Sequence, residues 1–301
     1  MIRTIFTVAL LLKTGISAFA APKVVASIVP LHSLVAGVMY GVAEPELLLK
    51  GVNSEHQASY SPQQIADLGH ADLVFIIGDN LEAKLGEISG TDAVNGKTFV
   101  KLNLAHGVIK HHIREGGTWD VDRDEPATGN TVDPHIWLDP ENAKAMTTAI
   151  AAALSQADAA NAPTYNANAA REIAALGVLE IEIKATLEPD KGKPFIVFHD
   201  AYQYFERRFG MNAVGSISDY TATPPSAARL EEIRNKIKSS NAVCAFREPQ
   251  FSDAAVSVVT EGSKAKLGVL DPIGAKLTPG RLAYFELLRD VTKNLKDCLG
   301  G

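Results

Sequence analysis

Several features that the sequence lacks limit the classes to which the protein can belong. Its 301 residues contain no run of about 20 consecutive apolar residues, so no membrane-spanning helix is expected. The HExxH and paired CxxC motifs of many zinc enzymes and zinc-binding folds are absent. No obvious serine or cysteine nucleophile motif occurs either. We therefore expect a soluble globular protein that is not an enzyme.

The first 20 residues, MIRTIFTVALLLKTGISAFA, have the pattern of a secretory signal peptide. Arg3 supplies the positive charge, residues 5–12 form the apolar run, and Ala18-Phe19-Ala20 match an A-x-A cleavage site. The mature chain would then begin at Ala21. The alternative is an ordinary amphipathic first helix.

Acidic residues outnumber basic ones, and the excess grows if this segment is removed. The segment holds Arg3 and Lys13 and no acidic residue, so its loss takes the formal net charge from −6 to −8. A negative surface repels phosphate backbones, and nucleic acid is therefore not an expected partner. Such a surface attracts cations only weakly and in a salt-dependent way.

Cysteine is scarce: Cys244 and Cys298, 54 residues apart, are the only two. In an exported protein an isolated pair of this kind predicts a disulfide, with two buried reduced cysteines as the alternative. The bond would tie the last helical stretch to the apolar run 241–248. In the chain-entropy description it would stabilise the fold by roughly 4 kcal/mol.

Eight apolar, strand-like runs alternate with helical patterns along the chain. Their alternation predicts parallel sheets covered by helices on both faces. The predicted fold class is α/β, with two lobes that each contain a roughly four-stranded parallel sheet flanked by helices. The runs are residues 23–30, 46–50, 72–78 and 98–104, followed by 194–200, 212–218, 241–248 and 267–272.

A long segment without a strand pattern separates the two sets of runs. It places apolar residues at helical spacings and ends at Pro189 and Gly192. A helix of about 24 residues extends about 36 Å, enough to join two lobes rigidly. The predicted organisation is a signal peptide (1–20), an N-terminal lobe (21–162), a linking helix (163–188) and a C-terminal lobe (189–301).

Candidate metal ligands follow several of the predicted strands. His199 follows FIVF, Asp271 follows LGVL, Glu55–His56 follow ELLLK, and His135 lies between two prolines in VDPHIWLDP. Ligands of open α/β sheets bind at the carboxyl ends of strands. Three imidazoles and one carboxylate suit zinc, although capping or core roles would also explain each histidine, and Asp271 could simply begin a turn.

Five stretches of the chain resemble the zinc-specific solute-binding proteins of ABC importers, the ZnuA type within the cluster A-I metal-binding family. They occur in family order over nearly the whole mature chain. The stretches are SEHQASYSPQQIADLGHADLVFIIG, DPHIWLDPENA, FHDAYQYFERRFGM, FREPQF and LDPIGA.

The resemblance implies a ligand set. The family's three histidine ligands fall on His56, His135 and His199, and its fourth position, a carboxylate or water, falls on Asp271, with Glu55 as the competing carboxylate. The manganese-selective branch typically has glutamate where this chain has His199, so the histidine favours zinc. The family's cysteine pair also matches this chain's pair.

The implied function is high-affinity capture of Zn²⁺ in the periplasm, between two lobes, and delivery to an ABC permease in the inner membrane. We expect a monomer, and a periplasmic metal donor is a further candidate partner. Histidine binds metal when deprotonated, so affinity should fall below about pH 6.5. Alternatives are a carrier of another metal such as manganese, a secreted zinc-dependent hydrolase, or a surface adhesin. No lipobox cysteine lies near the cleavage site, which favours a free periplasmic protein.

One segment departs from the family pattern. Residues 106–133 lack periodicity and are expected to form a mobile loop. Many family members have a long His/Asp-rich loop here, whereas this chain has few histidines and aspartates in the segment. Those that it has would collect or hand over metal, or else belong to a solvated acidic loop. They are His106, His111, His112, Asp120, Asp122 and Asp124.

Overall fold

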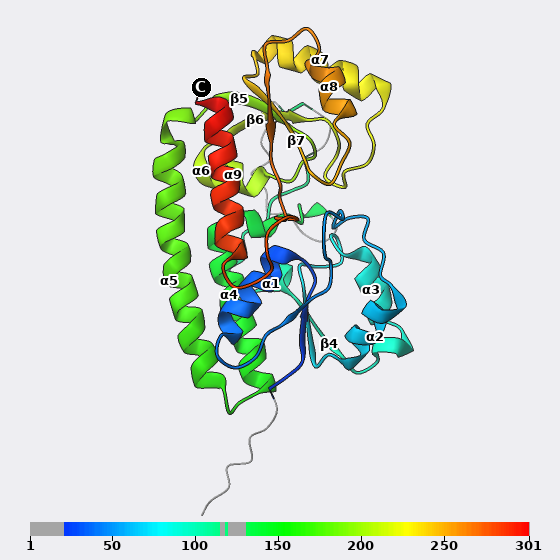
Figure 1. Ribbon diagram of the computed structural model, residues 1–301, viewed down its shortest axis with the longest axis vertical. Helices are drawn as coiled ribbons and strands as arrows, with labels where there is room; N and C mark the ends of the chain where they lie inside the picture. Colours follow the sequence, from blue (N-terminus) through cyan, green and yellow to red (C-terminus); the bar gives the residue numbers. More distant parts are fainter. Residues whose placement is uncertain (1–20, 115–117, 120–130, 301) are drawn as a thin grey trace, which may run out of the picture.

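The protein has two lobes that are joined along one side by long helices (Figure 1). The computed structural model describes residues 21–114, 118–119 and 131–300. The predicted signal peptide lies outside the described residues. No helix in the described part of the chain is long and apolar enough to cross a membrane.

Each lobe is built on a four-stranded parallel sheet, as predicted. The strand orders are β2-β1-β3-β4 and β6-β5-β7-β8, so the two sheets have the same topology. The central strands β1, β3, β5 and β7 are apolar and largely buried because both of their faces are covered. The eight strands in the described part of the chain lie on the predicted apolar runs, except that β8 begins one residue early, at Lys266. They are β1 (Val24–Ala26), β2 (Glu46–Leu47), β3 (Leu73–Ile76), β4 (Thr98–Lys101), β5 (Pro194–Val197), β6 (Asn212–Ser216), β7 (Cys244–Arg247) and β8 (Lys266–Val269).

Further helices complete the lobes, and local sequence signals explain where several of them begin. Ser61 caps α2 in a reciprocal capping box with Gln64, and Asp139 caps α4. Proline occupies the first turn of α1, α2, α4 and α5, where its missing N–H costs nothing. These helices are α1 (Val29–Met39), α2 (Pro62–His70), α3 (Ala83–Ser89), α4 (Pro140–Ala157), α6 (Gln203–Phe209), α7 (Ala227–Ser240) and α8 (Ala254–Thr260).

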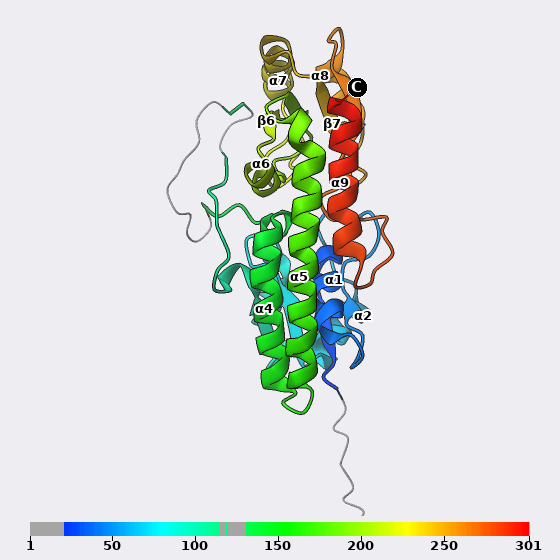
Figure 2. The ribbon, with the colours of Figure 1, turned by 90° about the vertical axis from the view of Figure 1, so that its left-hand side faces the viewer.

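Two long helices connect the lobes. The predicted linking helix is present as α5 (Ala162–Leu187), and α9 (Ala283–Leu299) runs beside it (Figure 2). Helix α9 packs against α1 of the first lobe and β8 of the second. The bridging role of α9 was not predicted, because a helical pattern alone does not say which elements its apolar face will contact.

The hydrophobic core continues from one lobe into the other. One cluster includes Val24 of the first sheet, Trp137 at the waist and Phe195 of the second sheet. The Trp137 indole donates to the Pro272 carbonyl (2.7 Å), and the Tyr284 hydroxyl donates to the Trp137 carbonyl (2.7 Å). The lobes are therefore packed as one body at this side of the molecule.

The strand ends of the first sheet are occupied by a buried carboxylate. Glu82 accepts hydrogen bonds from the Ser27 hydroxyl and from the backbone N–H of Gly78 (2.9 Å). Asn80, in the turn that these bonds hold, donates to the Val132 carbonyl (2.8 Å). The first lobe thus fixes the position of the segment that leads to His135.

The predicted disulfide is present and joins Cys244 of β7 to Cys298 of α9, with a Cα–Cα distance of 6.2 Å. It attaches the far end of the second bridging helix to the centre of the second sheet.

We expect the Cys244→Ala/Cys298→Ala variant to lose about 2–5 kcal/mol of unfolding free energy, because its unfolded chain is no longer constrained. Urea denaturation would measure this loss, and reduction of the unaltered protein should reproduce it. Equal stability with and without the bond would contradict the prediction.

Candidate metal centre

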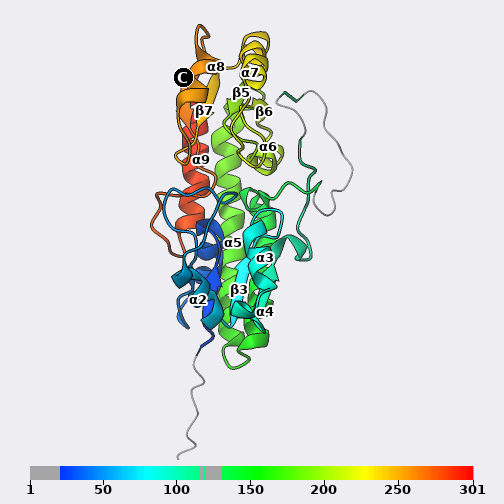
Figure 3. The same cartoon turned by 90° about the vertical axis from the view of Figure 1, so that its right-hand side faces the viewer.

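Glu55 and His56 lie in the loop between β2 and α2, which reaches the waist between the lobes (Figure 3). The side chains are 2% and 4% exposed, respectively, although the surrounding loop is polar. The capping box at Ser61 holds the end of this loop against α2. The side chains are thus buried on a segment that is otherwise open to solvent.

His135 is held by a carboxylate two residues before it. One oxygen of Asp133 accepts from the His135 backbone N–H (3.0 Å) and lies 2.8 Å from the ring Nδ1. A short 3-10 helix, Ile136–Leu138, follows directly. Because Nδ1 is engaged behind the ring, Nε2 is left facing the waist.

His199 follows β5 and has the same kind of support. Its Nδ1 lies 2.7 and 2.8 Å from the two carboxylate oxygens of Glu248, which follows β7. Strands β5 and β7 are parallel neighbours, so their carboxyl ends bring these two residues together. Both His135 and His199 therefore have buried carboxylates that fix the orientation of the ring.

The three histidines and Glu55 converge on one point. Their candidate ligand atoms all lie within 4.8 Å of one another. The Nε2 atom of His135 is 3.1 Å from that of His56 and 3.3 Å from that of His199. Zinc–nitrogen bonds of 2.0–2.1 Å in a tetrahedron place neighbouring nitrogens about 3.3–3.4 Å apart. The spacing matches the edges of a tetrahedral zinc site.

Glu55 supplies the oxygen of this group. Its Oε1 is buried without a hydrogen-bond partner and lies 4.0 Å from the Nε2 atoms of both His56 and His199. A buried polar atom without a partner is costly unless it binds something. The donor set, three imidazoles and one carboxylate, suits zinc better than oxygen-preferring cations.

Asp271 lies apart from this group. Its carboxylate accepts backbone N–H bonds from Ile273, Gly274 and Ala275 (3.2, 3.0 and 2.8 Å) and one bond from the Gln250 side chain (2.8 Å). These bonds engage both oxygens in the turn after β8. The structure therefore gives Asp271 the turn-forming role that its position before a proline also allows.

The three predicted loop histidines are not part of this group. His106 is exposed, the His111 ring packs against Tyr204 with centroids 4.8 Å apart, and His112 pairs with Val132. The predicted Asp120, Asp122 and Asp124 lie outside the described residues. Within residues 21–114, 118–119 and 131–300, no second group of three metal-binding side chains is present.

Two supporting carboxylates, Asp133 and Glu248, were not identified from the sequence. Asp133 stands two residues before His135, a spacing that allows a bond to both the backbone and the ring. Glu248 is the last residue of the predicted run 241–248 and directly follows β7, but its role depends on β5 and β7 being neighbours. The order of strands in a sheet is not readable from the apolar pattern.

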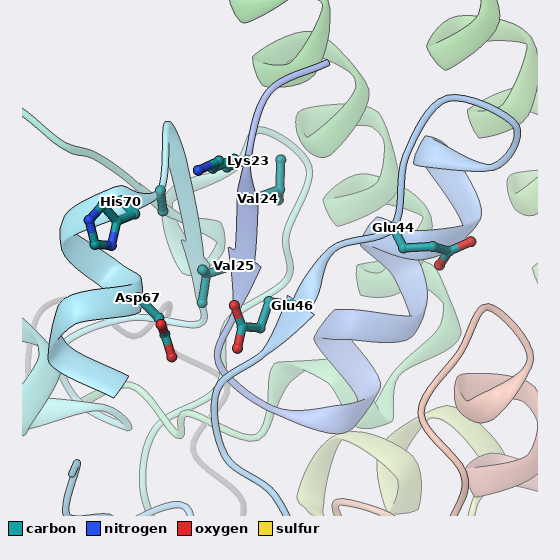
Figure 4. Close-up of a pocket in the computed structure, with 8 residues that line it drawn as sticks. Lys23, Val24, Val25, Glu44, Glu46, Asp67 and His70 are labelled. Carbon is teal, nitrogen blue, oxygen red and sulfur yellow. The ribbon is translucent and has the colours of Figure 1, made fainter. Parts of the chain in front are cut away.

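A separate hollow of about 440 Å³ lies beside the amino-terminal end of the first sheet (Figure 4). Side chains of both charge signs and apolar residues line it, including Lys23, Glu46, Asp67 and His70. Lys23, Glu46 and His70 are exposed to solvent. Open α/β sheets bind ligands at the carboxyl end of their strands, so this hollow lies at the end of the sheet where no ligand is expected.

Burial and nearby charges set the protonation of the centre. Burial lowers the pKa of His56 and His135 well below 6.5, and each is lowered further by the neighbouring histidines. Burial also acts to lower the pKa of His199, but the Glu248 carboxylate, with Glu55, outweighs it and raises that pKa to about 9. Burial raises the pKa of Glu55 to about 7. At neutral pH the metal-free centre therefore holds a proton on His199.

Known proteins with this fold bind metals. A crystal structure of ZnuA superimposes with a TM-score of 0.78 at 25% identity, covering 93% of this chain and 99% of that one. A zinc-bound deletion mutant of ZnuA gives a TM-score of 0.76 at 26% identity, covering 93% and 98%. The two-lobed architecture is that of the solute-binding proteins to which these structures belong.

The sequence comparisons identify the family. Residues 24–298 match the family described as zinc-uptake complex component A, periplasmic (ZnuA). The high-affinity zinc uptake system protein ZnuA of Brucella abortus (strain 2308) is 40% identical over 92% of this chain and 91% of its own length. The Paracoccus denitrificans protein of the same name is 35% identical over 93% and 92%. The chain belongs to the ZnuA family.

The raised pKa of His199 predicts that zinc affinity increases with pH up to about 9, well beyond the limit of about 6.5 expected for ordinary histidines. Zinc must displace the His199 proton, so about one proton should be released per zinc at pH 8. Near pH 6 the release should approach about two, because Glu55 is then also protonated. Calorimetric titrations in buffers of different ionisation enthalpy measure this number. A flat affinity profile between pH 7 and 9 would contradict the prediction.

The carboxylate behind His199 predicts a further effect. Glu248→Gln keeps the size and one acceptor oxygen but removes the charge, and zinc affinity should fall roughly 10- to 100-fold. Proton release at pH 8 should decrease in the same variant. Glu172→Gln is a matched control, since Glu172 is a buried glutamate on α5 beside Gly37 of α1. Equal effects of the two substitutions would show that Glu248 has no special relation to the metal.

Proposed function

We propose that this protein captures Zn²⁺ in the periplasm with Glu55, His56, His135 and His199 as its four ligands. The observation that carries the proposal is the spacing of the His135 Nε2 atom from those of His56 and His199, which fits two edges of a zinc tetrahedron, beside the unpaired Glu55 oxygen. Family membership and the zinc-bound relative support the choice of cation. Four protein ligands occupy every position of a tetrahedral zinc, whereas a catalytic zinc keeps one position for water. This favours a binding protein over a zinc hydrolase.

Binding would lock together segments from both lobes. His199 comes from the second sheet, and Glu55, His56 and His135 come from the chain before α5. We assign residues 21–162 to the N-terminal lobe, 163–188 to the linking helix and 189–301 to the C-terminal lobe. Because α5 and α9 both bridge the lobes, loading and release would proceed by movement of the loop that carries His56 rather than by wide opening of the lobes.

The loaded protein would then act as a monomer that delivers zinc to an ABC permease in the inner membrane. Cleavage after Ala20 would release the mature chain into the periplasm. A periplasmic metal donor would be an earlier partner, and the loop 106–133 would assist the transfer. The alternative function is that of a manganese carrier. Three imidazole nitrogens make the site a poor match for manganese, which prefers oxygen ligands.

A zinc titration of the metal-stripped protein against a competing chelator, with Mn²⁺ in parallel, tests the proposal. One tight equivalent of zinc and weak manganese binding are expected.

His199→Ala should weaken zinc binding by more than about 100-fold, beyond the usual effect of groups behind the ligands. Glu55→Gln should weaken it strongly, whereas Asp271→Asn, the matched control, should leave it nearly unchanged. If Asp271→Asn weakened zinc binding strongly and Glu55→Gln did not, Asp271 would be the fourth ligand. Absence of a tight site in the unaltered protein would overturn the proposal.

A further inference from the structure

A buried arginine cluster lies next to the metal centre. The Arg114 side chain is 16% exposed, and its guanidinium is shared between Asp200 and Glu206. Arg114 Nε lies 3.0 Å from each Asp200 oxygen, and Nη1 lies 2.7 Å from Glu206 Oε2. The Trp119 ring covers the guanidinium at 3.5 Å. Nothing in the proposed coordination of zinc uses this cluster.

Arg114 reaches the second lobe on a segment that comes from the first. The segment follows β4, and two of its residues add to the edge of the second sheet. Thr118 pairs with Gly215 in an antiparallel bridge, and the Trp119 N–H donates to the Val214 carbonyl (3.4 Å). This part of the chain therefore joins the lobes on the side of the molecule away from α9 (Figure 2).

The same segment is bonded to the support of His135. The Asp133 N–H donates to the His111 carbonyl (2.9 Å), and the Ile113 N–H donates to the Thr131 carbonyl (2.8 Å). The Tyr204 hydroxyl of α6 donates to the Asp133 carbonyl (2.8 Å) and accepts from the His111 N–H (3.1 Å). Movement of residues 111–114 would therefore move Asp133, which orients the His135 ring.

Asp200, the main partner of Arg114, directly follows His199 in the chain. We infer that Arg114 is a positioning residue for the metal centre, which holds the segments carrying His135 and His199 at the separation that zinc requires. The inference rests on the proposed zinc site. It assigns Arg114 a role in affinity although the residue contacts neither ligand ring nor cation.

The physical basis is preorganisation. The His135 and His199 Nε2 atoms lie 3.3 Å apart, the edge length of a tetrahedral zinc site, and ligand groups must be held within about 0.5 Å of their productive positions. A planar guanidinium with two bidentate partners fixes both distance and angle, which a lysine cannot do. If Arg114 only balanced charge, its removal would leave more negative charge near the site and strengthen cation binding. Positioning and charge balance therefore predict opposite signs.

The test compares variants that leave no buried charge unpaired, because Arg114→Gln alone leaves two buried carboxylates without a partner and can prevent folding. The triple variant Arg114→Met/Asp200→Asn/Glu206→Gln removes the tie without leaving a buried charge. Its matched control is Arg208→Met/Asp139→Asn. This variant removes the ion pair between Arg208 of α6 and Asp139 at the start of α4, in which two hydrogen bonds of 2.7 Å are made. Zinc dissociation constants are measured by chelator competition at 25 °C, and melting temperatures are measured without metal.

The triple variant should bind zinc at least about tenfold more weakly than the unaltered protein. The control should melt at a lower temperature but keep its affinity within about threefold, and this contrast separates positioning from general stability. Arg114→Lys, which keeps the charge but not the planar geometry, should also bind more weakly.

Unchanged affinity in the triple variant would overturn the inference. If the triple variant does not fold, wild-type affinity in Arg114→Lys would overturn it instead. Because the triple variant also removes one net negative charge, which by itself weakens cation binding, weaker binding must appear in the charge-conserving Arg114→Lys variant as well, and wild-type affinity there would overturn the inference. Failure of the unaltered protein to bind zinc would reject the proposed function itself, so the two failures are distinguishable.

Discussion

The approach of His135 to His199 across the waist is the interaction on which the rest of the structure depends. Two imidazoles from different lobes face each other at 3.3 Å, and each is held from behind by a buried carboxylate. Such an arrangement is stable only if a proton or a metal ion lies among the ring nitrogens. The Asp133 and Glu248 carboxylates and the pairing of β5 with β7 keep these two rings from separating.

The connections between the lobes keep the site closely defined. Helices α5 and α9, a core that passes through Trp137, and the Cys244–Cys298 bond secure one side of the molecule. The crossing segment at Arg114 and Trp119 secures another side. In the proposed zinc carrier, connections on two sides of the site would keep the distances between ligands fixed, which would disfavour a cation with different bond lengths.

The fold was largely predictable because buried parallel strands are continuous apolar runs, and α5 shows helical spacing over a long uninterrupted stretch. The site was less predictable. His135 and His199 stand at strand ends or on a pinned segment, where convergence is expected, but the resemblance was needed to select them. Asp271 also follows a strand, yet its side chain turns back to the N–H groups of its own turn. Side-chain direction and strand order are tertiary properties, which explains why Glu248 and Arg114 were missed.

The identical strand order of the two sheets has a consequence for how the chemistry is divided. Glu82 and Glu248 occupy corresponding places, at the carboxyl ends of β3 and β7, but Glu82 is already engaged by Ser27 and a backbone N–H, whereas Glu248 engages a ring. The first lobe has thus filled its strand ends with bonds to itself and contributes ligands from connecting segments. The two halves share a strand order but differ in their proposed roles: the second would hold His199 at the end of a strand, and the first would offer its ligands on segments that can move more easily.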